Sequence, residues 1–423
     1  MGSLATKPRY DAYKDSREGW IGEIPSHWHV QKLKHLFYEK KHTSNPTLGC
    51  GAISFGEVIS KDDDKIPLST KASYQEVLSG EILINPLNLN YDLKSLRIAL
   101  SRIDVVVSAG YIVIKEKTDI DKGYFKYLLH RYDVANMKLL GSGVRQTINF
   151  HHIANSQLVL PIKSEQVAIS RFLDQKSAQI YEAIAIKEKQ IALLKERKQI
   201  IIQQAVTQGL DPNVPMKDSG VGWIGRIPAN WEVRKSKYLF TQRKERAWKS
   251  DVQLSATQAY GVIPQSEYEA LSGNTVVKIQ FHLDKRKHVE KDDFVISMRS
   301  FQGGLERAWS SGCIRSSYVI LRSLEEINPD FYGYLLKLPS YIKALQRTGS
   351  FIRDGQDLNF DNFAQVDLFI PPIEEQCEIA NYVKGFMVSS DKGIALLQEQ
   401  IEKLKEYKAT LIHSAVTGKI KLV

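Results

Sequence analysis

The chain has 423 residues, more than a single hydrophobic core usually organises, so we expect two or three domains. Hydrophobic residues make up 43% of the chain, but no apolar run approaches the roughly 20 residues of a membrane-spanning helix, and the N-terminus resembles no secretion signal. The three cysteines form no C-x-x-C pair, which argues against a disulfide framework or structural zinc and predicts a cytoplasmic protein. The formal charge of +10 favours a polyanionic partner without identifying one.

An unusual phrase occurs twice. KDSREGWIGEIPSHW begins at Lys14 and KDSGVGWIGRIPANW begins at Lys217, and residues 14–37 align with 217–240 without a gap at 15 identities in 24 positions. Further matches appear at shifted offsets, and the offset is 210 from Asn149-Phe150 onward. The chain therefore consists of two homologous halves of about two hundred residues each, which is a duplication and not a solenoid.

Each half has the same predicted order of elements. In the first half, short apolar strands at 82–85 and 111–115 are separated by polar loops, and a helical, hairpin-like stretch follows at 121–140. A last strand at 158–161 precedes a long helix, predicted over about 164–207, which is roughly 65 Å at 1.5 Å per residue.

A heptad seam runs along the long helix of both halves. Ser177, Lys187 and Lys198 interrupt the first copy, and Gly209 and Gly418 are placed to end the two helices. The seam consists of Leu173, Ile180, Ile184, Ile191, Leu194, Ile201 and Ala205 in the first half, and of Val383, Met387, Ile394, Leu397, Ile401, Leu404, Leu411 and Ala415 in the second.

Because both halves carry the seam, each long helix is the natural partner of the other. We predict an α/β (mixed) protein in which two homologous globular domains are separated by two long antiparallel helices, an intramolecular coiled coil with approximate two-fold symmetry. The Trp and Ile residues of the repeated phrase are interpreted as a packing plug between helix end and domain, with a binding role for the Trp pair as the alternative.

The combination of motifs resembles one family. Each half is entered through G-W-I-G-x-I-P-x-x-W and left through a P-x-x-x-E-Q helix start, P-I-K-S-E-Q at 161–166 and P-P-I-E-E-Q at 371–376. These features, spread over essentially the whole chain, resemble the specificity (S) subunit of a type I restriction–modification system. The resemblance implies target-recognition domains at 1–160 and 210–370, and spacer helices at 161–209 and, with the C-terminal tail, at 371–423.

The resemblance also implies a function and partners. It implies a non-catalytic subunit that reads a bipartite, asymmetric site in double-stranded DNA with one domain per half-site. It further implies docking of methyltransferase (M) subunits, two in number, and of restriction/translocase (R) subunits, without a membrane partner. The chain itself is expected to need no cofactor, since S-adenosylmethionine, ATP and Mg²⁺ would belong to the partner subunits.

Candidate base contacts lie in loops that follow a matched strand and then diverge between the halves. Arg and Lys suit guanine, and Asn and Gln suit adenine. The candidates in the first half are Asn88, Asn90, Tyr91, Lys94 and Arg97, followed by Arg145 and Gln146; those in the second half are Arg299, Ser300, Gln302 and Arg307, followed by Arg353. For the pair of glycine-bearing loops that carry Arg145 and Arg353, a structural capping role remains an alternative, and any of these cations can instead be a solvated surface group.

We searched for catalytic motifs as well. Asn85-Pro86-Leu87-Asn88 lacks the second proline and the aromatic residue of the loop with which adenine methyltransferases hold their base, and no phosphate-binding glycine loop occurs. His151-His152 and Asp62-Asp63-Asp64 have no companion ligands at metal spacing. Two other classes stay open: a degenerate adenine methyltransferase, which would bind S-adenosylmethionine alone, and a protein-binding scaffold, which would lack a steep salt dependence.

Overall fold

The computed structural model describes residues 8–64, 66–87, 96–137, 140, 148–276, 285–297, 300–348 and 358–422, without the side chain of Phe301. The chain divides into two compact units. Unit 1 comprises Met1–Glu188 and Leu397–Val423, and unit 2 comprises Lys189–Leu396. Both long helices cross from one unit into the other, so each unit contains a segment of each helix.

Unit 1 is built on a six-stranded sheet of strand order β4-β11-β8-β9-β6-β5, antiparallel except for the parallel pair β6–β9. Its strands are β4 (Phe37–Glu39), β5 (Gly51–Ser54), β6 (Glu57–Ser60), β8 (Ile82–Ile84), β9 (Ile98–Leu100) and β11 (Ile112–Glu116). Two-stranded sheets pair β1 (Tyr13–Asp15) with β2 (Glu23–Pro25), β7 (Gln75–Val77) with β10 (Val105–Val107), and β3 (His29–Lys32) with β12 (Gln157–Leu160). The helices of the globular part are α1 (Leu33–Leu36), α2 (Leu68–Ala72), α3 (Lys122–Ala135) and α4 (Phe150–Ala154).

Unit 2 repeats this plan with a four-stranded sheet of order β16-β23-β20-β21. Its strands are β16 (Phe240–Arg243), β20 (Phe294–Ile296), β21 (Glu306–Arg307) and β23 (Val319–Ser323). The paired strands are β13 (Met216–Asp218) with β14 (Arg226–Pro228), β15 (Glu232–Lys235) with β24 (Asp367–Ile370), β17 (Leu254–Thr257) with β18 (Gly261–Pro264), and β19 (Lys287–Val289) with β22 (Gly312–Ile314). The helices are η3 (Ser236–Tyr238), α6 (Gln265–Ser272), α7 (Ser300–Gly303), α8 (Pro329–Leu335), α9 (Pro339–Arg347) and α10 (Phe360–Gln365).

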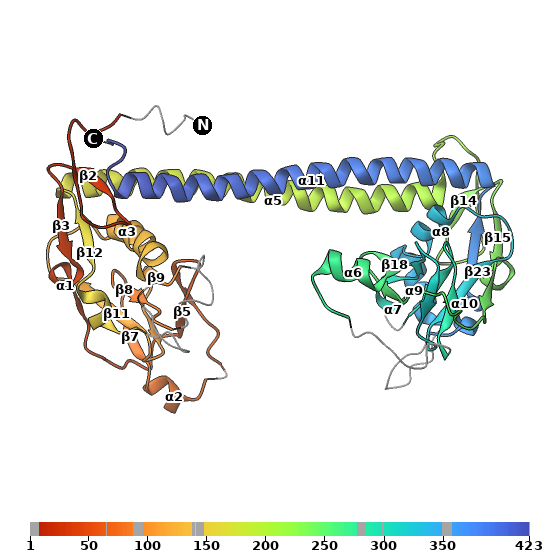
Figure 1. Ribbon diagram of the computed structural model, residues 1–423, viewed down its shortest axis with the longest axis horizontal. Helices are drawn as coiled ribbons and strands as arrows, with labels where there is room; N and C mark the ends of the chain where they lie inside the picture. The colour runs from red at the N-terminus through yellow and green to blue at the C-terminus, as the bar shows by residue number, and fades with distance from the viewer. Residues whose placement is uncertain are drawn as a thin grey trace. The chain divides into compact units, whose positions relative to one another are not determined.

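The registers confirm that the two halves share one fold. Ile112 of β11 faces Ile84 of β8, and the matching pair in unit 2 is Val319 with Ile296. In the same way, β3 pairs with β12 below the start of the first long helix, as β15 pairs with β24 in unit 2 (Figure 1). The strands predicted at 82–85, 111–115 and 158–161 are β8, β11 and β12.

The helical stretch after β11 differs from the prediction. Within the described residues, unit 1 has the single helix α3 where we expected a hairpin, whereas unit 2 has two helices, α8 and α9. The reason lies in Pro339, which occupies the first turn of α9 and starts a new helix, because proline cannot continue the preceding one. The segment of α3 contains no proline.

The two long helices are α5 (Lys163–Gln208) and α11 (Ile373–Val416), of 46 and 44 residues. Every residue of the predicted seam is buried or half-buried, as a heptad seam requires. In unit 1, Lys187 Nζ donates to Gln400 Oε1 at 2.5 Å, and the ammonium of Lys408 lies 3.9 Å from the ring centre of Tyr181. In unit 2, Lys198 Nζ donates to Asp391 Oδ1 at 2.7 Å. Successive residues along α5 contact residues of α11 with decreasing residue numbers, so the two helices pair antiparallel. Two of the polar residues that interrupt the seam, Lys187 and Lys198, are each bonded to a polar side chain of the opposite helix.

No helix in the described part of the chain combines the length and apolarity that a membrane span requires.

Candidate nucleic-acid interface

The repeated phrase lies where one long helix starts. In unit 1, Trp28 is fully buried and its indole Nε1 donates to Glu165 Oε2 at 2.9 Å, in the first turn of α5. In unit 2, Trp231 is fully buried and donates to Glu375 Oε2 at 2.6 Å, in the first turn of α11. Each carboxylate also suits the positive end of the helix dipole. The second Trp of each phrase therefore anchors a helix start.

The glutamine of each P-x-x-x-E-Q motif joins the same junction. Gln166 Nε2 donates to the carbonyl of Pro161 at 2.8 Å, and its Oε1 accepts from the backbone N–H of Asp121, also at 2.8 Å. Asp121 in turn caps α3 by accepting from the N–H of Tyr124. Gln376 makes the equivalent pair of bonds in unit 2, to Pro371 and to the capping residue of α8. The motif thus ties the start of a long helix to the start of a domain helix.

The other long helix ends against the same tryptophan. Gly418, just after α11, has φ +71°, and a Cβ there would lie 3.0 Å from Trp28 Cη2 and 2.3 Å from Pro25 Cδ. Gly209, just after α5, has φ +76°, and a Cβ there would lie 3.6 Å from Trp231 Cζ2. These positions need glycine for its left-handed backbone, and Gly418 also for its lack of a side chain. The packing interpretation is confirmed for Trp28 and Trp231, which have no exposed surface for a ligand. The first Trp of each phrase, Trp20 or Trp223, is half-buried.

Eight of the twelve candidate DNA contacts lie outside the described residues: Asn88, Asn90, Tyr91, Lys94, Arg145, Gln146, Arg299 and Arg353. Arg97, which is described, lies at the end of the first candidate loop. Its backbone N–H donates to the carboxylate of Asp133 on α3, and its Nη1 donates to the carbonyl of Leu87 at 3.1 Å. The two ends of the segment 88–95 are thereby tied to each other.

The second candidate loop contains three described candidates in different settings. Gln302 is exposed on α7. Ser300 is fully buried, and its Oγ accepts from the N–H of Ser297 at 2.9 Å, so it presents no surface to a base in this conformation. Arg307 is 11% exposed and lies between two carboxylates, with Nη2 2.5 Å from Asp292 Oδ1 and Nη1 bonded to Asp330. This geometry favours a structural role for Arg307.

The same strand pair frames the divergent segment in both units. Residues 85–97 connect β8 to its antiparallel neighbour β9, and residues 297–305 connect β20 to its antiparallel neighbour β21. Because β8 and β20 occupy the same place in the two sheets, the fold presents two unrelated sequences from equivalent positions. This arrangement is what two domains that recognise different ligands require.

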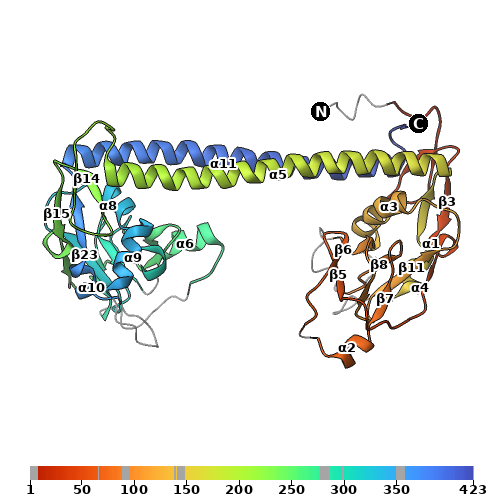
Figure 2. The same cartoon turned by 180° about the vertical axis from the view of Figure 1, so that it is seen from behind.

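Sequence reasoning missed the aromatic side chains beside these segments. The turn between β5 and β6 lies at one edge of the unit 1 sheet (Figure 2). Phe55 is in this turn, is 90% exposed and has φ +50°. Tyr260 is in the loop between β17 and β18, and is 38% exposed. The detectable signal was an aromatic–glycine pair at the same turn of both halves, Phe55-Gly56 and Tyr260-Gly261. The search for polar contacts passed over it.

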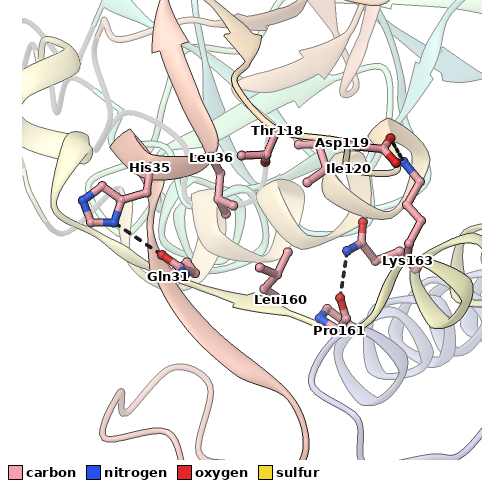
Figure 3. A pocket seen from close by; sticks show the side chains of 10 residues that line it. Gln31, His35, Leu36, Thr118, Asp119, Ile120, Leu160, Pro161 and Lys163 are labelled. Carbon is pink, nitrogen blue, oxygen red and sulfur yellow. Dashed lines mark hydrogen bonds and ion pairs between the residues drawn. The ribbon is translucent and has the colours of Figure 1, made fainter.

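A surface pocket of about 320 Å³ in unit 1 lies beside the start of α5 (Figure 3). Several of its polar groups are paired with one another or with the backbone: His35 with Gln31 at 3.3 Å, Lys163 with Asp119 at 2.5 Å, and Gln166 with Pro161. A nucleophile–base pair is not among its ten lining residues. The pocket belongs to the structural junction at the start of α5.

Two largely buried ion pairs, one in each unit, have a structural role. Arg243 Nε lies 2.6 Å from Asp293 Oδ2 in unit 2, and burial raises the pKa of Asp293 above its ordinary value although Arg243 opposes the shift. In unit 1, Lys40 lies 2.9 Å from Glu81, which is 4% exposed. These carboxylates are committed to cations beneath the surface. Among the described residues, His, Cys, Asp and Glu form no group of three that could hold a metal ion.

Two ranges of the chain, 89–196 and 228–406, match the family model for the type I restriction modification DNA specificity domain, and together they make up more than half of the chain. The chain belongs to this family. All twelve candidate residues except Asn88 lie within the matched ranges. The specificity-domain match thus covers the divergent segments as well as the framework.

Similar proteins agree with this membership. Over 195 residues the chain is 26% identical to the specificity subunit of the type I restriction enzyme MjaVIII of Methanocaldococcus jannaschii, an alignment that covers 45% of the chain and 43% of that relative. Two solved structures share the fold at 13% identity. One, described as the structural basis of complex assembly and conformational transition of the type I R-M system, has a TM-score of 0.66 over 93% of this chain and 98% of its own. The other, the HsdS subunit of Thermoanaerobacter tengcongensis, has a TM-score of 0.51 over 94% and 98%.

Proposed function

We propose that this chain is the non-catalytic DNA-recognition subunit of a type I restriction–modification complex. One domain would read each half of a bipartite, asymmetric site. The observation that carries the proposal is that one framework occurs twice, with unrelated segments inserted between equivalent strands. A duplicated reader with two different loops predicts two different half-sites separated by a fixed spacer.

The proposed division of labour follows the predicted domains. Residues 1–160 and 210–370 would form the two recognition domains, and 161–209 and 371–423 would form the spacer helices. Direct base readout is assigned to the segments that connect β8 to β9 and β20 to β21, through Asn88, Asn90, Tyr91, Lys94, Arg299 and Gln302. Arg145, Gln146 and Arg353 are proposed as further contacts to phosphate or base.

The remaining three described candidates are assigned differently. Arg97 is proposed to hold the ends of its loop together, because its guanidinium bonds to Leu87. Arg307 is proposed to support the loop from below through its two carboxylate partners, and Ser300 to shape it through its bond to Ser297. Readout would then depend on these side chains indirectly.

Methyltransferase subunits are the proposed partners of the long helices. In unit 2, apolar side chains that the seam does not use remain about half exposed: Leu193 at 54% and Ile200 at 47% on α5, and Val388 at 62% and Leu396 at 56% on α11. Apolar side chains outside the seam of a paired helix are available to a further helix. R subunits would join the complex through the M subunits or directly, and the chemistry would belong to these partners.

A map of methylated adenines in the source DNA, with the gene intact and deleted, tests the proposal. Loss of a single interrupted, asymmetric motif on deletion is the expected result and would define both half-sites. A further strain would carry Leu193→Glu with Ile200→Glu, matched by Lys195→Glu as a control for charge on an exposed face of the same helix. The double variant should lose the motif and the bound methyltransferase, and the control should keep both.

Two outcomes would contradict the proposal. An unchanged methylation map, together with a co-purified partner that is not a methyltransferase, would support a protein scaffold. Binding of S-adenosylmethionine by the isolated chain would support a methyltransferase that acts alone. A scaffold would also show none of the steep log–log dependence on salt that phosphate contacts produce.

A further inference from the structure

The turn between β5 and β6 presents a side chain that folding does not explain. Phe55 has φ +50°, a left-handed backbone that a bulky residue rarely adopts, while its ring is 90% exposed. Glycine or asparagine would suit this two-residue turn better, because both reach positive φ at lower cost. A strained backbone that holds an aromatic ring in solvent indicates a contact outside the chain.

The tip of this hairpin packs on Leu96, just before β9, and on α3. A Cβ at Gly56 would lie 2.6 Å from Leu96 Cδ1 and 3.0 Å from His130 Cε1, so the turn packs directly on the residue that follows 88–95 and on α3. In addition, Glu57 at the start of β6 pairs in parallel with Leu100 of β9, the strand that ends the segment. The turn that carries Phe55 is therefore held against Leu96 and His130, and its strand against Leu100.

Unit 2 repeats the arrangement with different side chains. Gly261, which follows Tyr260, has φ +73°, and a Cβ there would lie 2.7 Å from Trp309 Nε1. The N–H of Trp309 donates to the carbonyl of Val262 at 3.0 Å, and Trp309 follows β21, the strand that ends the second recognition segment. Trp309 is 48% exposed, and the guanidinium of Arg307 lies 4.3 Å from its ring centre. Both units thus place exposed aromatic rings where a hairpin contacts the strand that follows the recognition segment.

We propose that Phe55 in unit 1, and Tyr260 with Trp309 in unit 2, are specificity-determining contacts to double-stranded DNA. Each pair of strands would enter a groove at its own half-site, since the major groove admits a two-stranded ribbon. The rings would make apolar contacts with thymine methyl groups and sugar faces, next to the bases contacted by the polar side chains. The inference rests on the proposed function and adds residues that the polar search did not contain.

The test uses the complex of this chain with its methyltransferase subunits and a DNA duplex carrying the methylated motif. Phe55→Gly removes the ring and gives the turn a residue that accepts φ +50°, so the fold is kept. Tyr38→Ala is the matched control, because Tyr38 is a 40% exposed aromatic on β4, the strand at the opposite edge of the same sheet. Fluorescence anisotropy at several salt concentrations gives both the affinity and its salt dependence.

We expect Phe55→Gly to weaken binding about tenfold, in the range of the loss caused by one mismatched base pair in a specific duplex site. The slope of log affinity against log salt should stay unchanged, because no phosphate contact is lost. Tyr38→Ala should bind as the unmodified complex does. The loss caused by Phe55→Gly should disappear on duplexes whose first half-site is scrambled, and Tyr260→Ala should behave in the same way towards the second half-site.

Equal affinity of the Phe55→Gly and unmodified complexes would overturn the inference and leave the proposed function intact, since the complex would still recognise its motif. A changed salt slope would overturn it as well, because the ring would then act only through displaced charges. If the unmodified complex fails to distinguish the motif from random duplex, the proposed function fails first and the inference with it.

Discussion

Trp28→Phe is the most direct test of the junction between domain and helix. The substitution keeps an aromatic ring in a fully buried site but removes the indole N–H that donates to Glu165 at 2.9 Å. The Glu165 side chain is 6% exposed, so water cannot easily replace the lost donor, and His27, at 3.1 Å, and Tyr10 remain beside it. The perturbation therefore leaves a buried carboxylate with fewer partners.

The expected loss has two parts. A hydrogen bond to a charged group contributes about 1.5–3 kcal/mol. Reducing the indole to a phenyl ring in a filled site costs roughly a further 1–2 kcal/mol. Trp28→Phe should therefore lower the free energy of unfolding by about 2.5–5 kcal/mol.

The control is Trp20→Phe, in the same phrase. Trp20 is half-buried against the ring of Tyr132, with ring centres 5.7 Å apart, and its Nε1 has no hydrogen-bond partner among the described residues. It should lose only the packing part, about 1–2 kcal/mol. Urea unfolding followed by circular dichroism measures both variants, and a cycle of Trp28→Phe with Glu165→Gln should give a coupling of about 1 kcal/mol. Equal losses for the two tryptophans, or a coupling near zero, would refute the hydrogen-bond reasoning.

Three further predictions follow from the described geometry. Arg307→Gln should cost about 2 kcal/mol of stability by leaving Asp292 and Asp330 without their shared cation, whereas Gln302→Ala on the same segment should stay within about 0.5 kcal/mol, as urea unfolding can show. Replacing both Lys187 and Gln400 by Leu should raise the unfolding free energy by about 1 kcal/mol, because an apolar pair then completes the seam; a lower midpoint would show that the polar pair is needed. Burial lowers the pKa of His130 from 6.5 to about 4, so between these pH values the unfolded chain binds a proton that the folded chain does not. The stability contribution of neutral His130 is therefore full above pH 6.5 and should fall by up to roughly 3 kcal/mol as the pH approaches 4. His130→Gln should flatten this pH dependence of the unfolding free energy.

The sequence predicted the framework because packing constrains it twice. Trp28 and Trp231, Gln166 and Gln376, and Gly418 and Gly209 each make the same contact in both halves. A position that requires a buried indole, a helix-capping side chain or a left-handed backbone tolerates few residue types, so the two halves keep the same residue there after duplication. The heptad seam was readable for the same reason, since its period follows from helix geometry alone.

The candidate site was less readable because residue type does not distinguish a contact from a support. Arg307 suited guanine by its chemistry, but its environment comes from Asp292, on a tight turn before β20, and from Asp330 in α8. Loop sequence gave no sign that both carboxylates would converge on it. Phe55 was not predicted because its residue type is apolar; its significance rests on a φ of +50° and on an exposed ring, which only the three-dimensional structure shows.

The framework was easier to predict from sequence than the candidate site, and the difference has one physical origin. Junction residues such as Trp28 and Glu165 are constrained in pairs within the chain, so a change in one costs stability unless its partner also changes. A side chain whose main contact lies outside the chain has no such internal partner, and the segments after β8 and β20 have diverged while their flanking strands still match. Phe55 combines both conditions, because Gly56 binds the turn to the framework while the ring itself contacts solvent. A residue with a strained backbone and a side chain that has no partner within the chain is therefore a strong candidate for a functional contact in a duplicated recognition protein. The DNA affinity of the Phe55→Gly complex tests whether Phe55 is such a residue.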